Sequence, residues 1–125
     1  MSVVKLAKVH IVTVDVPALA RFYEAVVGTA AVGSDEYVEL RIDGGTLALC
    51  SQRAMAVCGA RAVTAARNGS MILDFEVNDV DASRYALKNV VSEFVLEPTT
   101  APWGNRTMLF RDPDGNLISF FSQME

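Results

Sequence analysis

Two stretches of the chain alternate between apolar and polar residues, as strands with one buried face do. They are residues 9–13 near the start and residues 71–77 in the second half. Each is soon followed by an aspartate, Asp15 or Asp79, whose carboxylate can accept hydrogen bonds from the first free N–H groups of a helix. The pattern therefore predicts a strand and then a helix in each half.

The helix predicted after Asp15 carries a single apolar stripe. Its apolar residues recur at helical spacing, at Leu19, Phe22, Tyr23, Val26 and Val27. Pro17 falls in the first turn, where a missing N–H costs little, and Gly28 follows as a natural C-terminal stop. In the second helix the matching stripe is predicted at Ala86, Leu87, Val90 and Val91.

Apolar runs separated by turn residues close each half of the chain. These runs are residues 37–42, 46–51, 107–111 and 117–122. The segments between them, Asp43-Gly44-Gly45 and residues 112–116, are rich in Asp, Gly, Pro and Asn, which tolerate or pre-set the backbone angles of turns. We therefore expect strands joined by tight turns at the end of each half.

The two halves repeat one another. Residues 12–28 align with residues 76–92 at an offset of 64, and residues 43–52 align with residues 114–123 at an offset of 71. Two matches in the same order indicate two copies of one supersecondary unit.

The repeat predicts an α+β fold made of two βαβββ modules. We place the first module at residues 1–52, a linker at residues 53–69 and the second module at residues 70–125, all within a single domain. A length of 125 residues suits one domain.

Composition excludes several classes of function. The chain carries a net charge of −4 and no basic run, which argues against nucleic-acid binding through phosphates. No segment approaches the roughly 20 apolar residues of a membrane span, and the N-terminus lacks the pattern of a signal peptide. We expect a cytoplasmic protein without a membrane partner, in which Cys50 and Cys58 are reduced, structural thiols.

Three segments carry a resemblance to a known family. They are VHIVTVDVPALARFYEAVVG (9–28), ILDFEVNDVDA (72–82) and PWGNRTMLFRDPDGNLISFFSQ (102–123). With them the sequence resembles the glyoxalase / bleomycin resistance / extradiol dioxygenase superfamily, also called the vicinal oxygen chelate proteins, and is most similar to its bleomycin-resistance branch. The resemblance implies a cup-shaped mixed sheet with helices on its outer face, often completed in a dimer, so we expect a homodimer.

The resemblance also implies where a metal ion would be held. The family's ligands lie on the first and last strand of each module, at positions that correspond here to Lys8, Ala48, Ile72 and Ser119. None of these is the His, Cys, Asp or Glu that zinc or iron requires. We therefore expect neither a metal ion nor another cofactor.

A shift of two residues in this alignment brings His10 and its repeat mate Asp74 to the metal positions. Side chains alternate along a strand, so His10 shares a face with Lys8, while Val9 and Ile11 face the helices. Three interpretations of His10 and Asp74 remain open. They are a polar pair lining the cup, recognition of a polar group on a ligand, and acid–base chemistry or a metal ion held out of register.

Three further residues are candidates for the cup. Trp103 lies in a loop that could stack on a planar ligand or fill a dimer contact. Arg106 could pair with an anionic ligand or stay solvated, and Phe121, the repeat mate of Cys50, could line the cup. The predicted ligand-binding residues are Lys8, His10, Asp74, Trp103, Arg106, Ser119 and Phe121. No residue is predicted to be catalytic.

Three functions compete on this evidence. The leading hypothesis is a metal-free protein that binds and sequesters a hydrophobic or aromatic small molecule. The second is a metal-dependent lyase, transferase or dioxygenase with a non-standard site around His10 and Asp74 or Glu76. The third is a protein-interaction module whose cup is vestigial.

Overall fold

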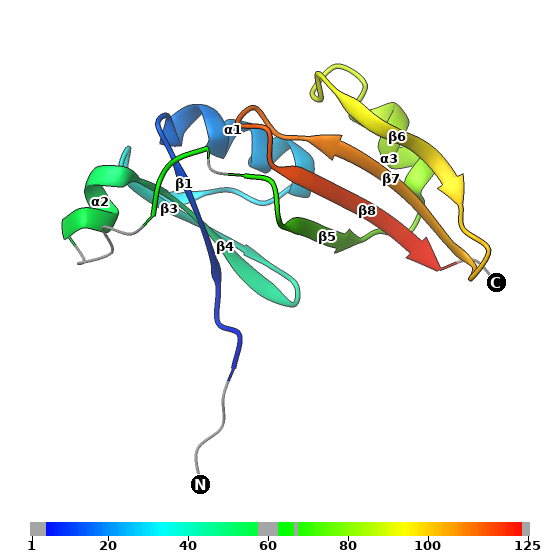
Figure 1. Ribbon diagram of the computed structural model, residues 1–125, viewed down its shortest axis with the longest axis horizontal. Helices are drawn as coiled ribbons and strands as arrows, with labels where there is room; N and C mark the ends of the chain where they lie inside the picture. Colours follow the sequence, from blue (N-terminus) through cyan, green and yellow to red (C-terminus); the bar gives the residue numbers. More distant parts are fainter. Residues whose placement is uncertain (1–4, 58–62, 67, 124–125) are drawn as a thin grey trace, which may run out of the picture. The chain divides into compact units, whose positions relative to one another are not determined.

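The computed structural model describes residues 5–57, 63–66 and 68–123. The chain divides into two compact units, residues 1–67 and 68–125, here called the N-terminal and C-terminal modules. In each of them a strand and a helix are followed by three strands (Figure 1). The fold is therefore α+β and consists of two βαβββ modules, as the repeat predicts.

The N-terminal module contains a four-stranded mixed sheet. Its elements are β1 (Val9–Thr13), α1 (Val16–Val27), β2 (Val32–Gly33), β3 (Tyr37–Ile42) and β4 (Gly45–Ser51), and the short helix α2 (Gln52–Val57) follows. The strands lie in the order β1-β4-β3-β2. The first and last strands, β1 and β4, are parallel, and β3 is antiparallel to both of its neighbours.

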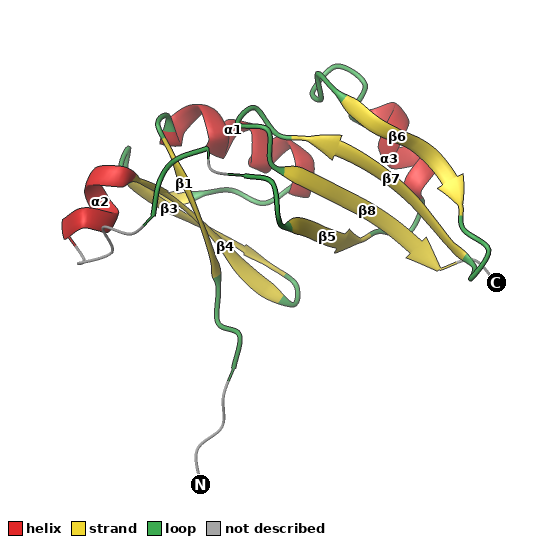
Figure 2. Ribbon diagram, in the orientation of Figure 1, coloured by secondary structure: helices red, strands yellow, loops and turns green. Residues whose placement is uncertain are grey.

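The C-terminal module repeats this arrangement. Its elements are β5 (Ile72–Glu76), α3 (Val80–Ala86), β6 (Phe94–Thr100), β7 (Asn105–Arg111) and β8 (Leu117–Gln123). The sheet order is β5-β8-β7-β6, again with the first and last strands parallel. Figure 2 shows the strands of both sheets in yellow and the helices in red.

Both module helices begin at the aspartates predicted to cap them. The Asp15 carboxylate accepts a hydrogen bond from the Ala18 N–H at 3.0 Å, and Asp79 accepts one from Ala82 at the same distance. Helix α1 ends at Gly28, whose φ of 73° is a left-handed conformation that glycine adopts without strain. Among the helices of the described residues, none combines the length and apolar character needed to cross a bilayer.

Helix α3 is shorter than its predicted apolar stripe. It ends at Ala86, and the chain then continues in turns, one of them closed by the Val90 N–H donating to the Leu87 carbonyl at 3.0 Å. Leu87 and Val91 are buried as predicted, whereas Ala86 and Val90 are exposed. The turns after Leu87 break the helical spacing, so only half of the predicted stripe reaches the core.

Each sheet has one face covered by a helix. In the N-terminal module α1 packs against β3 and β4, whose alternate residues Val38, Leu40, Leu47 and Leu49 are buried. In the C-terminal module α3 packs against β6, β7 and β8, and the buried residues include Met108, Phe110, Ile118 and Phe120. The opposite side of each sheet is here called its open face.

Candidate functional site

The open face of the N-terminal module brings predicted and unpredicted polar residues into one row. In the strand register His10 lies opposite Ala48, and Ala48 lies opposite Glu39. Because side chains alternate along each strand, residues two positions away share this face. Tyr37 and Cys50, which pair with each other, are therefore also on the open face.

Three of the side chains on this face form a hydrogen-bonded cluster. The Lys8 ammonium donates to Glu39 Oε2 at 2.6 Å, and the Tyr37 hydroxyl donates to the same oxygen at 2.9 Å. The His10 ring lies 5.9 Å from the Tyr37 ring, and its Nδ1 lies 3.8 Å from the sulfur of the buried Cys50. We call Lys8, Tyr37 and Glu39 the Lys8 cluster.

The cluster fixes the protonation states of its members at neutral pH. The hydrogen bond from Lys8, followed by that from Tyr37, lowers the pKa of the Glu39 carboxyl, and the charge of Arg41 lowers it further. The bond to Glu39 raises the pKa of Lys8. Burial, followed by the bond to Glu39, raises the pKa of Tyr37. The site therefore presents an ammonium, a carboxylate and a neutral phenol.

Lys8→Met is expected to raise the pKa of Glu39 toward its ordinary value of 4.5, because the strongest stabiliser of the carboxylate is removed. A carbon-detected NMR titration of the Glu39 side chain measures this, with the exposed Lys5→Met as the control. In the unmodified chain the folded pKa lies below the unfolded one. The Glu39 carboxylate therefore stabilises the folded chain at a pH above its ordinary pKa. This contribution to the free energy of unfolding is lost as the pH falls through the pKa of Glu39 in the folded chain. A pKa that is the same in both variants would contradict the cluster.

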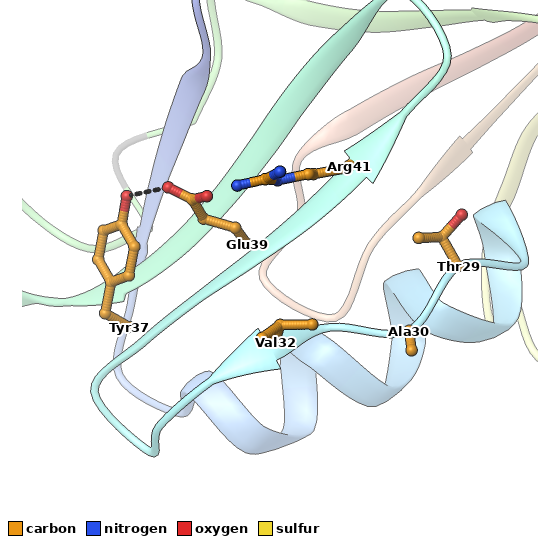
Figure 3. A pocket seen from close by; sticks show the side chains of 6 residues that line it. All are labelled: Thr29, Ala30, Val32, Tyr37, Glu39 and Arg41. Atoms are coloured by element: carbon orange, nitrogen blue, oxygen red, sulfur yellow. Dashed lines mark hydrogen bonds between the residues drawn. The ribbon is translucent and has the colours of Figure 1, made fainter.

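A hollow of about 520 Å³ adjoins the cluster on the same module. It is lined by Thr29, Ala30, Val32, Tyr37, Glu39 and Arg41 (Figure 3). The segment between α1 and β2 supplies Thr29 and Ala30, β2 supplies Val32, and β3 supplies the other three. The hollow thus has an apolar wall on one side and the aromatic and charged residues of β3 on the other.

The open face of the C-terminal module carries the equivalent row. Asp74 lies opposite Ser119, and Ser119 lies opposite Leu109. Phe121, two residues after Ser119, lies on the same face and pairs with Glu76. Asp74 is exposed, Phe121 is half-buried and Ser119 is buried. Three of the predicted site residues therefore share this face.

Trp103 and Arg106 are not part of this row. Arg106 lies on the helix-covered side of the sheet, where it donates to both carboxylate oxygens of Asp81 at 2.6 and 2.9 Å and to the Thr100 hydroxyl. Trp103 lies in the turn between β6 and β7 and is 79% exposed. The structure thus gives Arg106 a partner on α3 and leaves Trp103 on the surface.

The strand register decides which residues occupy equivalent positions in the two modules. His10 lies beside Ala48, and Asp74 lies beside Ser119. The partner of Ile72 is Leu117. The pseudo-equivalent positions are therefore His10, Ala48, Asp74 and Ser119, which is the alignment shifted by two residues that the sequence leaves open.

These residues do not fit a site for zinc or iron. At the equivalent positions each module offers one strong donor, His10 or Asp74, next to a methyl group or a lone hydroxyl, whereas such ions need three or four strong donors. Glu39, the next carboxylate along the row, already accepts from Lys8 and Tyr37. Within the described parts of the modules, no three His, Cys, Asp or Glu side chains come together in a way that could hold an ion.

The fold and the site define a class of proteins built from paired βαβββ modules with open sheet faces. The family model of the Glyoxalase/Bleomycin resistance protein/Dioxygenase superfamily matches residues 5–120. The chain belongs to this superfamily. Comparison with curated protein sequences gives no match.

Solved structures share this fold over nearly the whole chain. One is a glyoxalase/bleomycin resistance protein/dioxygenase family enzyme from Burkholderia phytofirmans PsJN, with a TM-score of 0.86, 17% identity and coverage of 97% of this chain and 100% of that one. A glyoxalase-related enzyme from Fulvimarina pelagi gives a TM-score of 0.80 at 24% identity over 95% and 88% of the two chains. A structure from the mobile metagenome of V. pseudocholerae gives 0.73 at 27% identity over 100% and 98%.

Proposed function

We propose that this protein binds a small, partly aromatic organic molecule on the open face of its N-terminal module, without a metal ion. The observation that carries the proposal is the hollow beside the Lys8 cluster. Its volume of about 520 Å³ falls within the roughly 300–1,000 Å³ of small-molecule sites. Such sites combine apolar walls with a few placed polar groups, and this hollow has both.

The residues around the hollow are suited to hold a ligand in one orientation. Val32 and Ala30 supply apolar contact, and the Tyr37 ring supplies a flat surface. The hydrogen bonds between Lys8, Tyr37 and Glu39 hold these side chains in place before a ligand arrives. Side chains that are already ordered lose less entropy on binding, which favours affinity.

The donor set supports binding without a metal ion. His10 and Asp74 are the strong donors at the equivalent positions, and Ala48 and Ser119 replace the others. A ligand would therefore be recognised by hydrogen bonds and apolar contact. This favours capture of a molecule over chemistry that depends on a coordinated ion.

Neutral planar compounds such as 2-naphthamide are expected to raise the melting temperature by several degrees. A ligand that binds only the folded chain, at 100 times its Kd, raises the free energy of unfolding by about 2.7 kcal/mol. Ala30→Trp should abolish this shift by filling the hollow. Ala25→Trp, at an exposed position on α1, is the matched control and should leave the shift intact. Differential scanning fluorimetry measures all three proteins. The proposal fails if no planar compound stabilises the unmodified protein.

Elemental analysis of untagged protein separates this function from the metal-dependent alternative. We expect a metal content far below one ion per chain, and no change in it on substitution of His10 by Ala. A stoichiometric metal that is lost in His10→Ala would instead establish a non-standard metal site.

A further inference from the structure

Arg41 is the one wall residue of the hollow whose charge has no close partner among the described residues. Among the residues that the structure describes, the Arg41 guanidinium makes no ion pair within 4.0 Å and no hydrogen bond. The neighbouring carboxylate, Glu39, already accepts from Lys8 and Tyr37 at one oxygen. In Figure 3 the Arg41 side chain extends along β3 toward Glu39. The hollow therefore presents a guanidinium that makes no hydrogen bond or ion pair among the described residues, near a carboxylate that already accepts from two other groups.

The local charge is opposite to that of the whole chain. On the β3 side of the hollow, Lys8 and Arg41 carry two positive charges against the single negative charge of Glu39. The Glu24 carboxylate lies by the opposite wall, where it accepts a hydrogen bond from the Ala31 N–H at 2.8 Å. The chain as a whole carries −4. The charge of Arg41 contributes to the lowered pKa of Glu39, which places the two groups close enough to interact. The β3 side of the hollow therefore attracts an anion and repels a cation.

We propose that the hollow takes an aromatic carboxylate, with the carboxylate on Arg41 and the ring between Tyr37 and Val32. This inference rests on the proposed function and names its ligand class. A planar guanidinium donates two parallel hydrogen bonds to a carboxylate, which fixes the orientation of the bound group. The Tyr37 ring and the Val32 side chain, on β3 and β2, lie on the wall that an aromatic body would contact.

The size of the effect follows from the exposure of Arg41. The residue is exposed, so solvent screens part of its attraction for an anion. We therefore expect a carboxylate to bind about five- to tenfold more tightly than the corresponding neutral amide. The preference for the carboxylate over the amide should decrease as the ionic strength rises, because dissolved ions screen exposed charges.

The test compares 2-naphthoate with 2-naphthamide by isothermal titration calorimetry at low salt, in three proteins. The unmodified protein should prefer the carboxylate by about five- to tenfold, the affinity ratio expected from one screened charged hydrogen-bonded contact. Arg41→Gln should bring the two affinities to within about twofold, chiefly by weakening the binding of the carboxylate. Arg21→Gln, at an exposed position of α1, removes the same charge from the other side of the module and should keep the full preference.

A fourth protein separates charge from geometry. Arg41→Lys keeps the positive charge but cannot donate two parallel hydrogen bonds, so it should retain only part of the preference. Melting temperatures of all variants establish that they are folded.

Equal affinities in the unmodified protein, or a preference that survives Arg41→Gln, would overturn the inference. If 2-naphthamide still binds and Ala30→Trp still blocks it, the proposed function stands while the ligand class is wrong. Binding of neither compound at about 1 mM overturns the inference. If the wider panel of planar compounds is then silent as well, the proposed function falls with it.

Discussion

Phe110→Ala is expected to lower the free energy of unfolding by about 3–5 kcal/mol, the range for removing a buried aromatic ring. Phe110 is 0% exposed, and its ring centroid lies 5.2 Å from that of Phe120 and 6.1 Å from that of Phe94. The substitution therefore removes two ring contacts and leaves a cavity. Since domains of this kind are stable by only about 5–15 kcal/mol, the loss is a large part of the total. Urea unfolding followed by circular dichroism measures it.

Phe121→Ala is the matched control for this prediction. Phe121 lies on the open face of the same sheet and is only half-buried. The same change of side chain should therefore cost less, because less apolar area leaves contact with the protein. Equal losses for the two variants would mean that the core of the C-terminal module is not where the structure places it.

Gly33→Ala is expected to destabilise the N-terminal module and to disturb the hollow. A Cβ at this position would lie 2.1 Å from the Tyr37 carbonyl oxygen and 2.8 Å from the Val38 Cα. Both contacts are with backbone, and Gly33 also has a φ of 151°, which side chains rarely adopt. Relief requires β2 to separate from β3, and Val32 on β2 lines the hollow. We expect a loss of at least about 1–3 kcal/mol and weaker binding of 2-naphthamide.

Gly45→Ala provides the comparison. Gly45 begins β4, and a Cβ there would meet nothing within 4 Å. Its effect on the melting temperature should be small, and a loss of backbone freedom in the unfolded chain favours a slight gain. Thermal unfolding and titration of both variants check the prediction. If Gly33→Ala melts at the same temperature as Gly45→Ala, the close approach of β2 to β3 is wrong.

The fold could be predicted where a strand has one buried and one open face. Two of the predicted strands, residues 9–13 and 37–42, match β1 and β3 in full because their apolar and polar positions alternate. The capping aspartates were equally informative, since their side chains act on neighbours three residues away. In these segments the residues near one another in the sequence were sufficient to predict the secondary structure.

The second strand of each module could not be located from the pattern. The two residues of β2 are both exposed, so they show no alternation. The other such strand, β6, contains Pro98 and shifts its register against β7, and most of its residues are exposed. Only pairing with a neighbouring strand identifies these segments, and that pairing is set by the tertiary fold.

The site was predicted in part. Alternation places Lys8 and His10 on one face, and the structure brings both to the open face. Alternation alone does not indicate that Tyr37 and Glu39 lie near Lys8 and His10. Their proximity depends on the strand order β1-β4-β3, which the sequence pattern does not contain. The signal available was the polar face of β3 itself, where Tyr37, Glu39 and Arg41 alternate with Val38 and Leu40.

The two cysteines illustrate the same division between local and tertiary information. Cys50 is buried, as expected for a structural thiol, although it lies on the open face. Its position on the central strand β4, beside the His10 ring, accounts for this. Cys58 lies outside the described residues.

The parallel pairing of β1 with β4 bears on the order in which a module assembles. The hairpin of β3 and β4 closes across Asp43 and Gly44, whereas Val9 meets Leu47 only after α1, β2 and β3 have been placed between them. Closing a longer loop costs more entropy, and contacts between residues near in sequence form sooner. The contacts of the β3–β4 hairpin are therefore expected to form before the pairing of β1 with β4. Although β1 precedes this hairpin in the module, we expect it to join the sheet after the hairpin has formed.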